Sequence, residues 1–390
     1  MDNSKLNKKP KPVKTEEEIL KEKLLKEKKS KYGQFDTGNN ECKFTIDEIK
    51  KFTNLYGDVL EPSFGTGNFV NELKKEDVSI DACEIDSTIY KPINGVNTFN
   101  SDFLLHEFDK TYDFIIGNPP YIELIYSYYS NVEVTKLKKL YDLKNRGRVN
   151  LIHLFYDKCF SLLNDDGVIS FLLPTTILNS PWYNDIRKKI YDEYTVLSIV
   201  DNVPFKDVAI KVCLLTIQKK IDSTHNLIIK NDDFYILSNF KRGENHMTLK
   251  DRGFTCQTGN ILWYLVKGKL SKEDGERVLI YTNNIKCNKL TLFKELKSKI
   301  DGKYQYINNN ESPIVKNCII TPRVIGKTFR HFLILDNERY VFENHVLIIT
   351  HENVDMLKEL NDYMTNFGGE FSKFFNSTNL TTKELLNFSY

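Results

Sequence analysis

Between about residues 55 and 220, short apolar runs alternate with stretches of helical periodicity, and this alternation constrains the fold more than any other feature of the chain. The runs that we expect to form strands are residues 59–60, 79–83, 112–116, 167–173, 197–200 and 211–217. Strands separated by helices build parallel βαβ units. The pattern therefore predicts an α/β fold with a Rossmann-like, doubly wound sheet, in which ligands bind beyond the carboxyl ends of the strands.

Three segments of different character divide the chain. Residues 1–31 are rich in Lys and Glu, and we expect a charged tail or a solvated helix that begins at Thr15, with Glu18 closing a capping box. Residues 32–220 form the α/β domain. After residue 220 the alternation is lost, and polar stretches rich in Asn, Lys and Tyr separate the apolar runs. Residues 221–390 are therefore expected to form a second domain, of the α+β type.

The composition indicates a reduced, cytoplasmic protein. Hydrophobic residues make up 41% of the 390 residues and charged residues 28%, which allows a buried core and excludes global disorder. The seven cysteines are scattered without a Cys-x-x-Cys pair, so neither a disulfide framework nor a zinc site is expected. The longest apolar run, residues 168–174, is far too short to span a bilayer, and the lysine-rich N-terminus lacks the apolar stretch of a signal peptide.

Charge is distributed unevenly along the chain, although the formal net charge is only +2. Residues 1–32 hold 11 Lys/Arg against 6 Asp/Glu, residues 33–220 hold 21 against 27, and residues 221–390 hold 23 against 20. An acidic middle between basic ends fits an enzyme domain joined to a module that faces a polyanion. Offsets of this size also arise by chance, so charge alone leaves both interpretations open.

Polar residues follow three successive strands at one edge of the predicted sheet. The loop 60–69 holds Gly65 and Gly67, which let the backbone approach a ligand at the start of a helix. Glu84 offers a carboxylate to the two hydroxyls of a ribose, and Asp102 offers an acceptor to an exocyclic amine. Each feature alone is also typical of a plain turn or a helix cap. Their near-equal spacing at one edge favours a nucleoside site.

A fourth motif, Gly117-Asn118-Pro119-Pro120-Tyr121, follows the strand at residues 112–116. The two prolines fix the backbone and leave carbonyl groups free, because neither ring nitrogen can donate a hydrogen bond. The side-chain oxygen of Asn118 and the carbonyl of Pro119 then form two rigid acceptors for one planar NH2 group, with the ring of Tyr121 beside them as a stacking face. Such hydrogen bonds draw the amine's hydrogens out of conjugation and expose its lone pair, so no strong general base is needed.

In order and in sequence, these motifs over about residues 30–220 resemble the S-adenosylmethionine-dependent DNA adenine-N6 methyltransferases of the gamma class, which are found in restriction-modification systems. The family's N-terminal aromatic-x-Thr motif matches Phe35-Asp36-Thr37, although Gly38 stands where a proline is usual. The resemblance implies direct transfer of a methyl group to N6 of an adenine that is flipped out of duplex DNA. It also implies that residues 221–390 are a target-recognition domain.

The resemblance assigns roles to individual residues. Those for the cofactor are Phe35 and Thr37 near its methionine end, Glu61 and Ser63 at the methionine moiety, Gly65 and Gly67 in the glycine loop, Glu84 at the ribose, Ile85 and Phe103 on the faces of the adenine, and Asp102 at the adenine amine. Those for catalysis are Asn118, Pro119, Pro120 and Tyr121, with Phe205 on the opposite face of the extruded base. A buried core position is the alternative for Phe205.

Basic residues in two segments are candidates for contacts with DNA. Residues 122–150 combine tyrosines with lysines and arginines, which suits a segment near phosphates and equally a solvated helix. In the second domain, three cations fall within residues 322–330, a turn-like segment suited to base edges or phosphates in a major groove, although surface charge explains them as well. The candidates are Lys144, Arg146, Arg148, Arg323, Lys327 and Arg330.

Other substrates fit the same four motifs. An RNA adenine-N6 methyltransferase and a protein glutamine-N5 methyltransferase present the same acceptors, and a noncatalytic DNA-specificity subunit is a further alternative. The long segment after residue 220 favours DNA, because the glutamine enzymes usually lack such a domain. The expected cofactor is S-adenosylmethionine and the expected partners are double-stranded DNA and a separate restriction endonuclease acting on the same site. The chain is expected to be a monomer without a metal ion or a membrane.

Overall fold

The computed structural model describes Gly33 and residues 37–143, 149–203, 211–220, 227–231, 233–238, 247–272, 274–286, 288–292, 304–308, 311–324, 329–368 and 380–388. The expected N-terminal tail or helix lies outside these residues. The described residues form two compact units: unit 1 runs to Leu173 and includes Val203–Lys219, and unit 2 comprises Pro174–Asn202 and the described residues from Lys220 onward. The predicted domain boundary at residue 220 stays a prediction, and residues 174–202 group with unit 2.

A seven-stranded sheet has the strand order β3-β2-β1-β4-β5-β7-β6. Its strands are β1 (Asp58–Glu61), β2 (Ser79–Cys83), β3 (Asn97–Phe99), β4 (Tyr112–Gly117), β5 (Leu163–Pro174), β6 (Thr195–Val203) and β7 (Val212–Gln218). Strand β1 pairs in parallel with both β2 and β4. Strands β2 and β3 lie on one side of β1 and β4 lies on the other, so the strand order reverses between β1 and β4. This confirms the predicted doubly wound α/β sheet and leaves a crevice beyond the carboxyl ends of β1 and β4.

Each predicted run falls in a strand, and the apolar character of the runs explains why. In β4, for example, Phe114, Ile115 and Ile116 are all buried, as expected for a parallel strand that is covered on both faces. Strand β3 is different, because it has three residues and none of them is buried. No apolar run in the sequence therefore marked its position.

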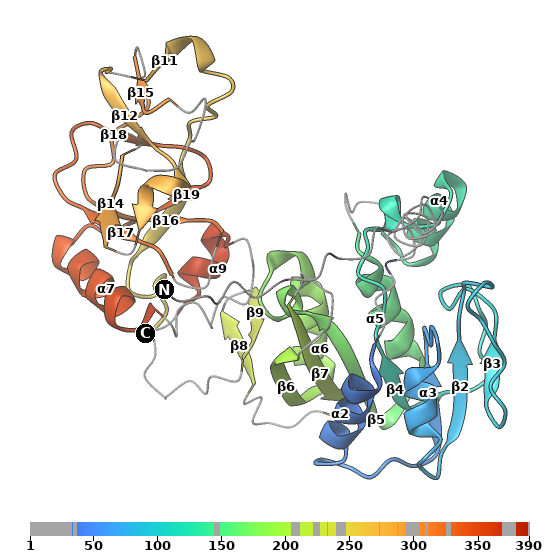
Figure 1. Cartoon of the computed structure of the whole chain (residues 1–390). Helices are drawn as coiled ribbons and strands as arrows, with labels where there is room; N and C mark the ends of the chain where they lie inside the picture. Colours follow the sequence, from blue (N-terminus) through green and yellow to red (C-terminus); the bar gives the residue numbers. More distant parts are fainter. Residues whose placement is uncertain are drawn as a thin grey trace, which may run out of the picture. The chain divides into compact units, whose positions relative to one another are not determined.

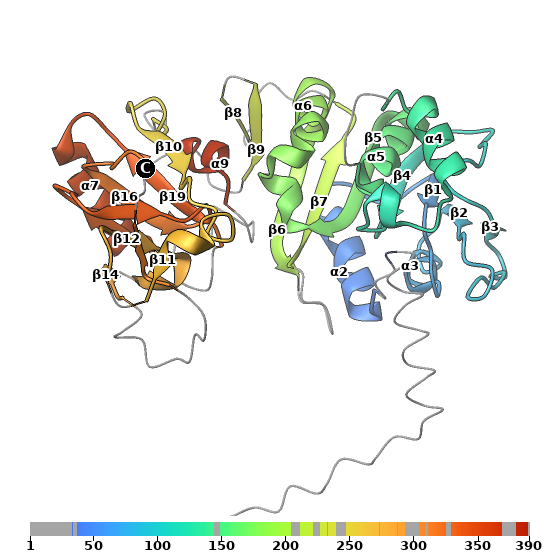
Figure 2. The same cartoon turned by 90° about the horizontal axis from the view of Figure 1, so that it is seen from above.

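The helices of unit 1 cover both faces of its strands, with α2 and α3 on one side and α5 on the other (Figure 2). They are α2 (Asn39–Ile49), α3 (Asn68–Leu73), α4 (Asn131–Leu140) and α5 (Leu151–Leu162). The side chain of Asn150 caps α5 by accepting the N–H of Ile152 at 3.0 Å. A capping box between Ser130 and Glu133 begins α4. These local signals fix where each helix starts.

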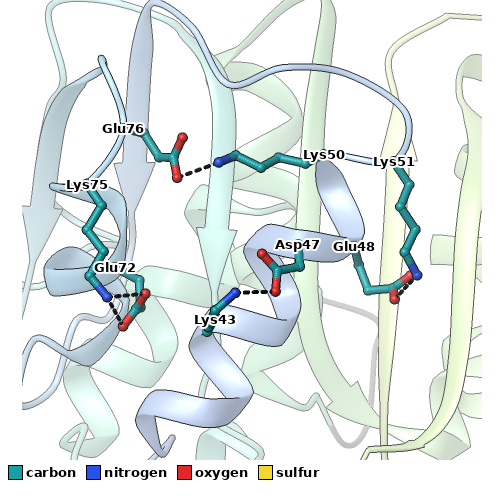
Figure 3. A network of polar contacts seen from close by, with 8 residues as sticks. All are labelled: Lys43, Asp47, Glu48, Lys50, Lys51, Glu72, Lys75 and Glu76. Atoms are coloured by element: carbon teal, nitrogen blue, oxygen red, sulfur yellow. Dashed lines mark hydrogen bonds and ion pairs between the residues drawn. The ribbon is translucent and has the colours of Figure 1, made fainter.

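Four ion pairs lie on the surface of α2, α3 and the turn after α3 (Figure 3). They are Lys43–Asp47 (2.6 Å), Lys51–Glu48, Lys75–Glu72 (2.6 Å) and Lys50–Glu76 (2.6 Å). Only the last of these four joins α2 to the segment after α3. Because exposed ion pairs contribute about 0–1 kcal/mol each, the two helices are held chiefly by burial of apolar side chains such as Ile46, Ile49 and Leu73.

Unit 2 contains two four-stranded sheets, with the orders β10-β19-β16-β17 and β11-β15-β12-β18, and the hairpins β8–β9 and β13–β14. Its strands are β8 (Ile228–Asn231), β9 (Phe234–Leu237), β10 (Thr255–Thr258), β11 (Leu270–Ser271), β12 (Arg277–Ile280), β13 (Ile285–Lys286), β14 (Lys289–Leu290), β15 (Tyr306–Ile307), β16 (Cys318–Pro322), β17 (Phe332–Ile334), β18 (Tyr340–Phe342) and β19 (Val346–Thr350). Its α-helices are α6 (Asn184–Glu193), α7 (Val354–Asn366) and α9 (Thr382–Leu386). This mixture is of the predicted α+β type (Figure 1).

Alternating residues of β16 build two separate cores in unit 2. Ile319 lies in a cluster with Leu357 of α7 and Leu385 of α9, whereas the next residue, Ile320, lies in a cluster with Val278 of β12. Successive side chains of a strand point to opposite faces, so one strand serves both cores. The predicted apolar run around Ile319 is thus a strand that is buried on both faces.

A buried arginine ties α6 to the hairpin β8–β9. The guanidinium of Arg187 donates to the backbone carbonyls of Tyr235 (2.5 Å), Ile177 (2.8 Å) and Ser180 (2.7 Å). Burial lowers the pKa of Arg187 to about 9, and the three carbonyls replace the water that a charged group loses. Arg187 therefore has a structural role.

Short 3-10 helices complete the described elements: η1 (Leu124–Tyr126), η2 (Thr175–Leu178), η3 (Pro181–Tyr183), η4 (Lys267–Lys269) and η5 (Thr282–Asn284). No helix in the described part of the chain has both the length and the apolar character that a bilayer crossing requires.

Candidate active site

An open pocket lies in unit 1, around the loops that follow β1, β2, β3 and β4. The predicted site residues that line it are Thr37, Glu61, Ser63, Gly65, Glu84, Ile85, Asp102, Phe103, Asn118 and Pro120. The structure therefore brings the four separate motifs of the sequence together at one edge of the sheet.

Glu61, the last residue of β1, has a carboxylate that is only partly satisfied. The residue is 1% exposed, and its Oε2 has no hydrogen-bond partner among the described residues. Burial, and after it the negative charge of Glu84, raises the pKa of Glu61 well above its usual range. A buried acceptor without a donor is costly unless a ligand supplies one. This carboxylate fits a cationic or N–H-bearing group, such as the ammonium of a bound amino acid.

The glycine loop is shaped by Gly65 and Gly67, which both adopt positive φ angles, +55° and +88°. A side chain at Gly65 would meet no atom within 4 Å, so its backbone faces open space, whereas one at Gly67 would lie 2.8 Å from the Ile93 side chain. The loop thus presents bare backbone to the pocket and begins α3 at Gly67. The positive φ angles explain why glycines stand at these two positions.

Glu84, after β2, fixes the glycine loop through hydrogen bonds to the backbone. Its Oε2 accepts the N–H of Gly65 at 2.8 Å, and its Oε1 accepts the N–H of Asp86 at 2.8 Å. Burial raises the pKa of Glu84, and these two backbone donors oppose the shift. Because each carboxylate oxygen has two lone pairs, both oxygens keep capacity for a pair of ligand hydroxyls. Ile85 lines the pocket beside it.

Asp102, after β3, is held by a tyrosine that the sequence did not single out for this site. Its Oδ1 accepts the N–H of Leu104 at 2.9 Å, and its Oδ2 accepts the hydroxyl of Tyr129 at 2.8 Å. The hydroxyl of Tyr128 in turn donates to that of Tyr129 at 2.9 Å. Burial raises the pKa of Asp102, and the hydrogen bond from Tyr129 is the largest of the effects that lower it.

The same tyrosines correct part of the interpretation of residues 122–150. We expected that segment to lie near phosphates or to form a solvated helix, and Tyr126 is indeed 62% exposed. Tyr129, however, is 8% exposed, and Tyr128 lines the pocket. Tyr128 therefore belongs to the pocket wall, and Tyr129 is buried against Asp102. The separation of 27 residues between Tyr129 and Asp102 explains why no local pattern revealed their contact.

Aromatic packing closes the pocket beyond Asp102. Phe103 is 3% exposed, and its ring centroid lies 4.9 Å from that of Phe155 in α5. Both rings line the pocket. A flat, apolar wall of this kind fits one face of a nucleobase. The spacing of α5 gave no sign that Phe155 would join the site.

Asn118, after β4, is oriented by two hydroxyl groups. Its Nδ2 donates to Oγ1 of Thr37 at 3.0 Å, and its Oδ1 accepts the hydroxyl of Tyr121. The Tyr121 hydroxyl is also 2.7 Å from the carbonyl oxygen of Leu172. A hydroxyl has only one proton to donate, so it satisfies one of these two acceptors at a time.

The other residues of the Asn-Pro-Pro-Tyr motif and its neighbours are placed as follows. Pro119 is buried and Pro120 lines the pocket. Oγ of Ser63 donates to the carbonyl of Asn118 at 3.2 Å, which joins the glycine loop to the motif. The side chain of Asn68 donates to the carbonyl of Thr37 at 2.7 Å and joins α3 to the N-terminal motif. Asn68 was not predicted as a site residue.

Several predicted residues lie outside the described part of the chain, namely Phe35, Phe205, Lys144, Arg146, Arg148 and Lys327. Arg323 and Arg330 are described and partly exposed in unit 2. The backbone of Arg323 bonds with His345 and Leu380, and Nη1 of Arg330 donates to the carbonyl of Thr282 at 3.4 Å. Within the described residues, no group of three or more His, Cys, Asp or Glu side chains is arranged to hold a metal ion.

Comparisons with known proteins indicate what the chain is similar to. Residues 14–206 match the family model of the Eco57I restriction-modification methylase. The chain is similar in sequence to Type II restriction-modification methylases. It is 28% identical over 342 residues to the modification methylase CviBIII of Paramecium bursaria Chlorella virus NC1A, with 84% of both chains covered. It is 25% identical over 354 residues to the Type II methyltransferase M.CvrRI of Paramecium bursaria Chlorella virus XZ-6E, covering 85% of this chain and 86% of that one.

Among solved structures, the type IIG restriction endonuclease BpuSI aligns with 91% of this chain and 58% of its own, at 13% identity and a TM-score of 0.43. The match to the methylase family spans all four strand-end motifs described above. The alignments with the two viral relatives cover 84% and 85% of this chain, so they extend well beyond residue 206 and include much of unit 2.

Proposed function

We propose that this protein is a gamma-class DNA methyltransferase that transfers a methyl group to N6 of an adenine flipped out of duplex DNA. The observation that carries the proposal is the amide of Asn118, which lines the pocket and donates to Oγ1 of Thr37. We infer further that it is the modification enzyme of a restriction-modification system, that it acts as a monomer and that a separate endonuclease cleaves the same site. The relative named a modification methylase, CviBIII, supports the first of these inferences.

S-adenosylmethionine is the cofactor, and the residues present fit it. The unpartnered Oε2 of Glu61 suits the ammonium of its methionine moiety, and the spare lone pairs of Glu84 suit its ribose hydroxyls. Asp102 and the wall formed by Phe103 and Phe155 suit its adenine. When bound, the cofactor supplies a sulfonium methyl group with a good leaving group. The chain then has only to position the acceptor amine.

Asn118 and Pro119 would accept the two hydrogens of the adenine amine. Hydrogen bonds to both hydrogens favour a pyramidal nitrogen, whose lone pair then points at the donor methyl group. The side chain of Asn118 is already oriented for this, because its Nδ2 is engaged by Thr37 and its oxygen therefore faces the other way. The hydroxyl of Tyr121 must donate to Leu172 rather than to Asn118 when the amine takes the Asn118 oxygen.

A target adenine has to leave the helix before it can enter this pocket, at a cost of a few kcal/mol. We infer that Tyr121 contacts one face of the extruded base and Phe205 the other. Stacking on aromatic rings contributes about 1–3 kcal/mol per base, which offsets most of that cost. The basic segment with Lys144, Arg146 and Arg148 would contact the phosphates.

A substrate comparison tests this function. Purified protein is incubated with S-adenosylmethionine that carries a labelled methyl group, together with equal amounts of duplex DNA, structured RNA or total protein. We expect label in duplex DNA alone. Label in RNA would favour an RNA adenine methyltransferase, and label on glutamine would favour a protein methyltransferase. Either result, with DNA unlabelled, would overturn the proposal.

A further inference from the structure

Three consecutive large apolar side chains are exposed in unit 2, just before η4. Trp263 is 39% exposed, Tyr264 57% and Leu265 71%. The other exposed large hydrophobic residues described in this unit, such as Leu335 and Phe367, are not consecutive in the sequence. Single exposed apolar residues are normal on protein surfaces, but a contiguous set usually marks a contact site.

The backbone on both sides anchors this segment. Ile261 is 3% exposed, belongs to a core cluster with Leu279 and Val341, and donates its N–H to the carbonyl of Phe342 at 3.2 Å. On the far side, Val266 and Leu270 pack against the same cluster. The segment leads into β11, which lies at the upper end of unit 2 in Figure 1, with α7 at the lower end. Residues 262–269, hereafter the Trp263 loop, therefore project from a fixed base.

Two turns give the Trp263 loop its shape. The N–H of Leu265 bonds to the carbonyl of Leu262 at 2.9 Å, and the N–H of Lys269 bonds to the carbonyl of Val266 at 2.9 Å. The first turn presents the rings of Trp263 and Tyr264 in an edge-to-face arrangement, with centroids 6.1 Å apart. A side chain at Gly268 would meet no atom within 4 Å, so the second turn also faces open space.

The charge within the Trp263 loop has one sign. Lys267 and Lys269 are its charged residues, and Lys272 follows it, ahead of the first carboxylates in the sequence, Glu273 and Asp274. Lys267 and Lys269 are exposed, and the ammonium of Lys272 lies 5.5 Å from the ring centroid of Tyr304. Exposed aromatic rings beside lysines are the combination that nucleic-acid surfaces use, with the cations on phosphates and the rings against bases.

We propose that the Trp263 loop is a DNA-contact element of unit 2, in which the lysines hold phosphates and Trp263 packs against a base or between base steps. This rests on the proposed function, because it takes DNA as the partner. A second copy of the chain suits the loop less well. Stable protein interfaces bury about 800 Å² per partner and are depleted in lysine, whereas this patch is one short loop with Lys267 and Lys269 in it and Lys272 directly after it.

The chain offers a direct reporter, because it has only two tryptophans, Trp182 and Trp263. The variant Trp182→Phe leaves Trp263 as the sole tryptophan. Its fluorescence is quenched with acrylamide before and after saturation with a random-sequence DNA duplex, with binding confirmed by anisotropy of a labelled strand. We expect the quenching constant to fall on DNA binding. An unchanged quenching constant at saturation would overturn the proposal.

Substitutions provide the second test. Trp263→Ala should weaken DNA binding about tenfold, the loss expected for one stacking contact. Lys267→Ala with Lys269→Ala should reduce the salt dependence of log K by about two. The matched control is Leu335→Ala, which removes an exposed apolar side chain beside Asp336 and Glu338 in the same unit, and it should leave binding unchanged.

The outcomes separate this proposal from the proposed function. Transfer of methyl groups to DNA with unchanged affinity in both loop variants would overturn the role of the loop and leave the function intact. Weaker DNA binding by the loop variants, with no methyl transfer to DNA by the unaltered protein, would overturn the function and support the loop. Altered sedimentation of Trp263→Ala with unchanged DNA affinity would indicate a contact between copies of the chain and overturn the proposal.

Discussion

The two sides of the pocket are built by different means. On the proposed cofactor side, Glu84 accepts the backbone N–H groups of Gly65 and Asp86, and Asp102 accepts the N–H of Leu104 together with the Tyr129 hydroxyl, so main-chain donors set most of their position. On the target side, Asn118 is held by the side-chain hydroxyls of Thr37 and Tyr121. Carboxylates fixed by the backbone are suited to a ligand that always binds in the same way. An amide held by hydroxyls is suited to a group that must exchange partners when the target base arrives.

Substitution of Asn118 separates the two sides most strongly. Asn118→Ala removes one of the two acceptors for the amine, and we expect a loss of roughly 10²–10³-fold in the rate of transfer, as for other preorganised catalytic hydrogen bonds. Affinity for the cofactor should stay within about twofold, because the contacts of Glu61, Glu84 and Asp102 are intact. Single-turnover rates and calorimetric titration with the cofactor measure the two quantities. A rate near that of the unaltered protein would refute the assigned role of Asn118.

Glu61→Gln tests the cofactor side. The substitution keeps the shape but removes the charge, so we expect cofactor binding to weaken by about tenfold or more, the loss of a charge-assisted hydrogen bond. Calorimetric titration with the cofactor gives the affinity, and Glu48→Gln is a matched control, because Glu48 is another largely buried carboxylate that does not line the pocket. Unchanged affinity for the cofactor would contradict the assignment of Glu61.

The pH dependence of Glu61 follows from its burial. Burial raises the pKa of this carboxyl, so the free protein holds the proton to higher pH than the unfolded chain does. The Glu61 carboxyl therefore makes its full contribution to the free energy of unfolding at pH values below the usual pKa of Glu. This contribution is lost as the pH rises through the raised pKa. Cofactor binding has the opposite trend, because an ammonium requires the ionised carboxylate. Glu61→Gln should raise Tm of the free protein at alkaline pH and flatten the rise of cofactor affinity with pH.

Thr37→Val tests whether a hydroxyl orients the Asn118 amide. Removing Oγ1 takes away the acceptor to which Nδ2 of Asn118 donates at 3.0 Å, which loosens the orientation of the amide, and we expect the transfer rate to fall by about tenfold, as for one lost hydrogen bond. Thr37→Ser keeps the hydroxyl and should restore most of the rate. A fall in cofactor affinity equal to the fall in rate would place Thr37 on the cofactor side instead.

Tyr129→Phe should have the smallest effect of these substitutions. Asp102 loses its bond from the Tyr129 hydroxyl but keeps the N–H of Leu104, so we expect cofactor affinity to fall about threefold to fivefold. The transfer rate at saturating cofactor should be unchanged. Tyr126→Phe alters a hydroxyl on an exposed tyrosine of the same segment and serves as the control.

The sheet was predictable because each long strand contains a mainly apolar run. Strand β5, for instance, has eight buried residues in succession, Gly167 to Pro174, and such a run is recognisable in the sequence. Strand β3 has three residues with none buried, and only the position of Asp102 after it hinted at a strand. Local apolar pattern reveals strands that are buried and leaves short edge strands hidden.

The site was predictable where a motif is local and hidden where a contact is long-range. Gly65, Glu84 and Asn118 each follow a strand, so topology alone brings them together. The bond between Asn118 and Thr37 spans 81 residues of sequence, and that between Asp102 and Tyr129 spans 27. No periodicity encodes such pairs, because they depend on how the loops after different strands fold over the pocket.

Nucleoside analysis of methylated DNA tests the central claim most directly. Duplex DNA is incubated with the protein and S-adenosylmethionine carrying an isotopically labelled methyl group, then digested to nucleosides and analysed by mass spectrometry, with Asn118→Ala in parallel. The account predicts label in N6-methyladenine alone, and its near absence with the variant. Label in a methylated cytosine, or equal label in N6-methyladenine from the variant, would contradict it.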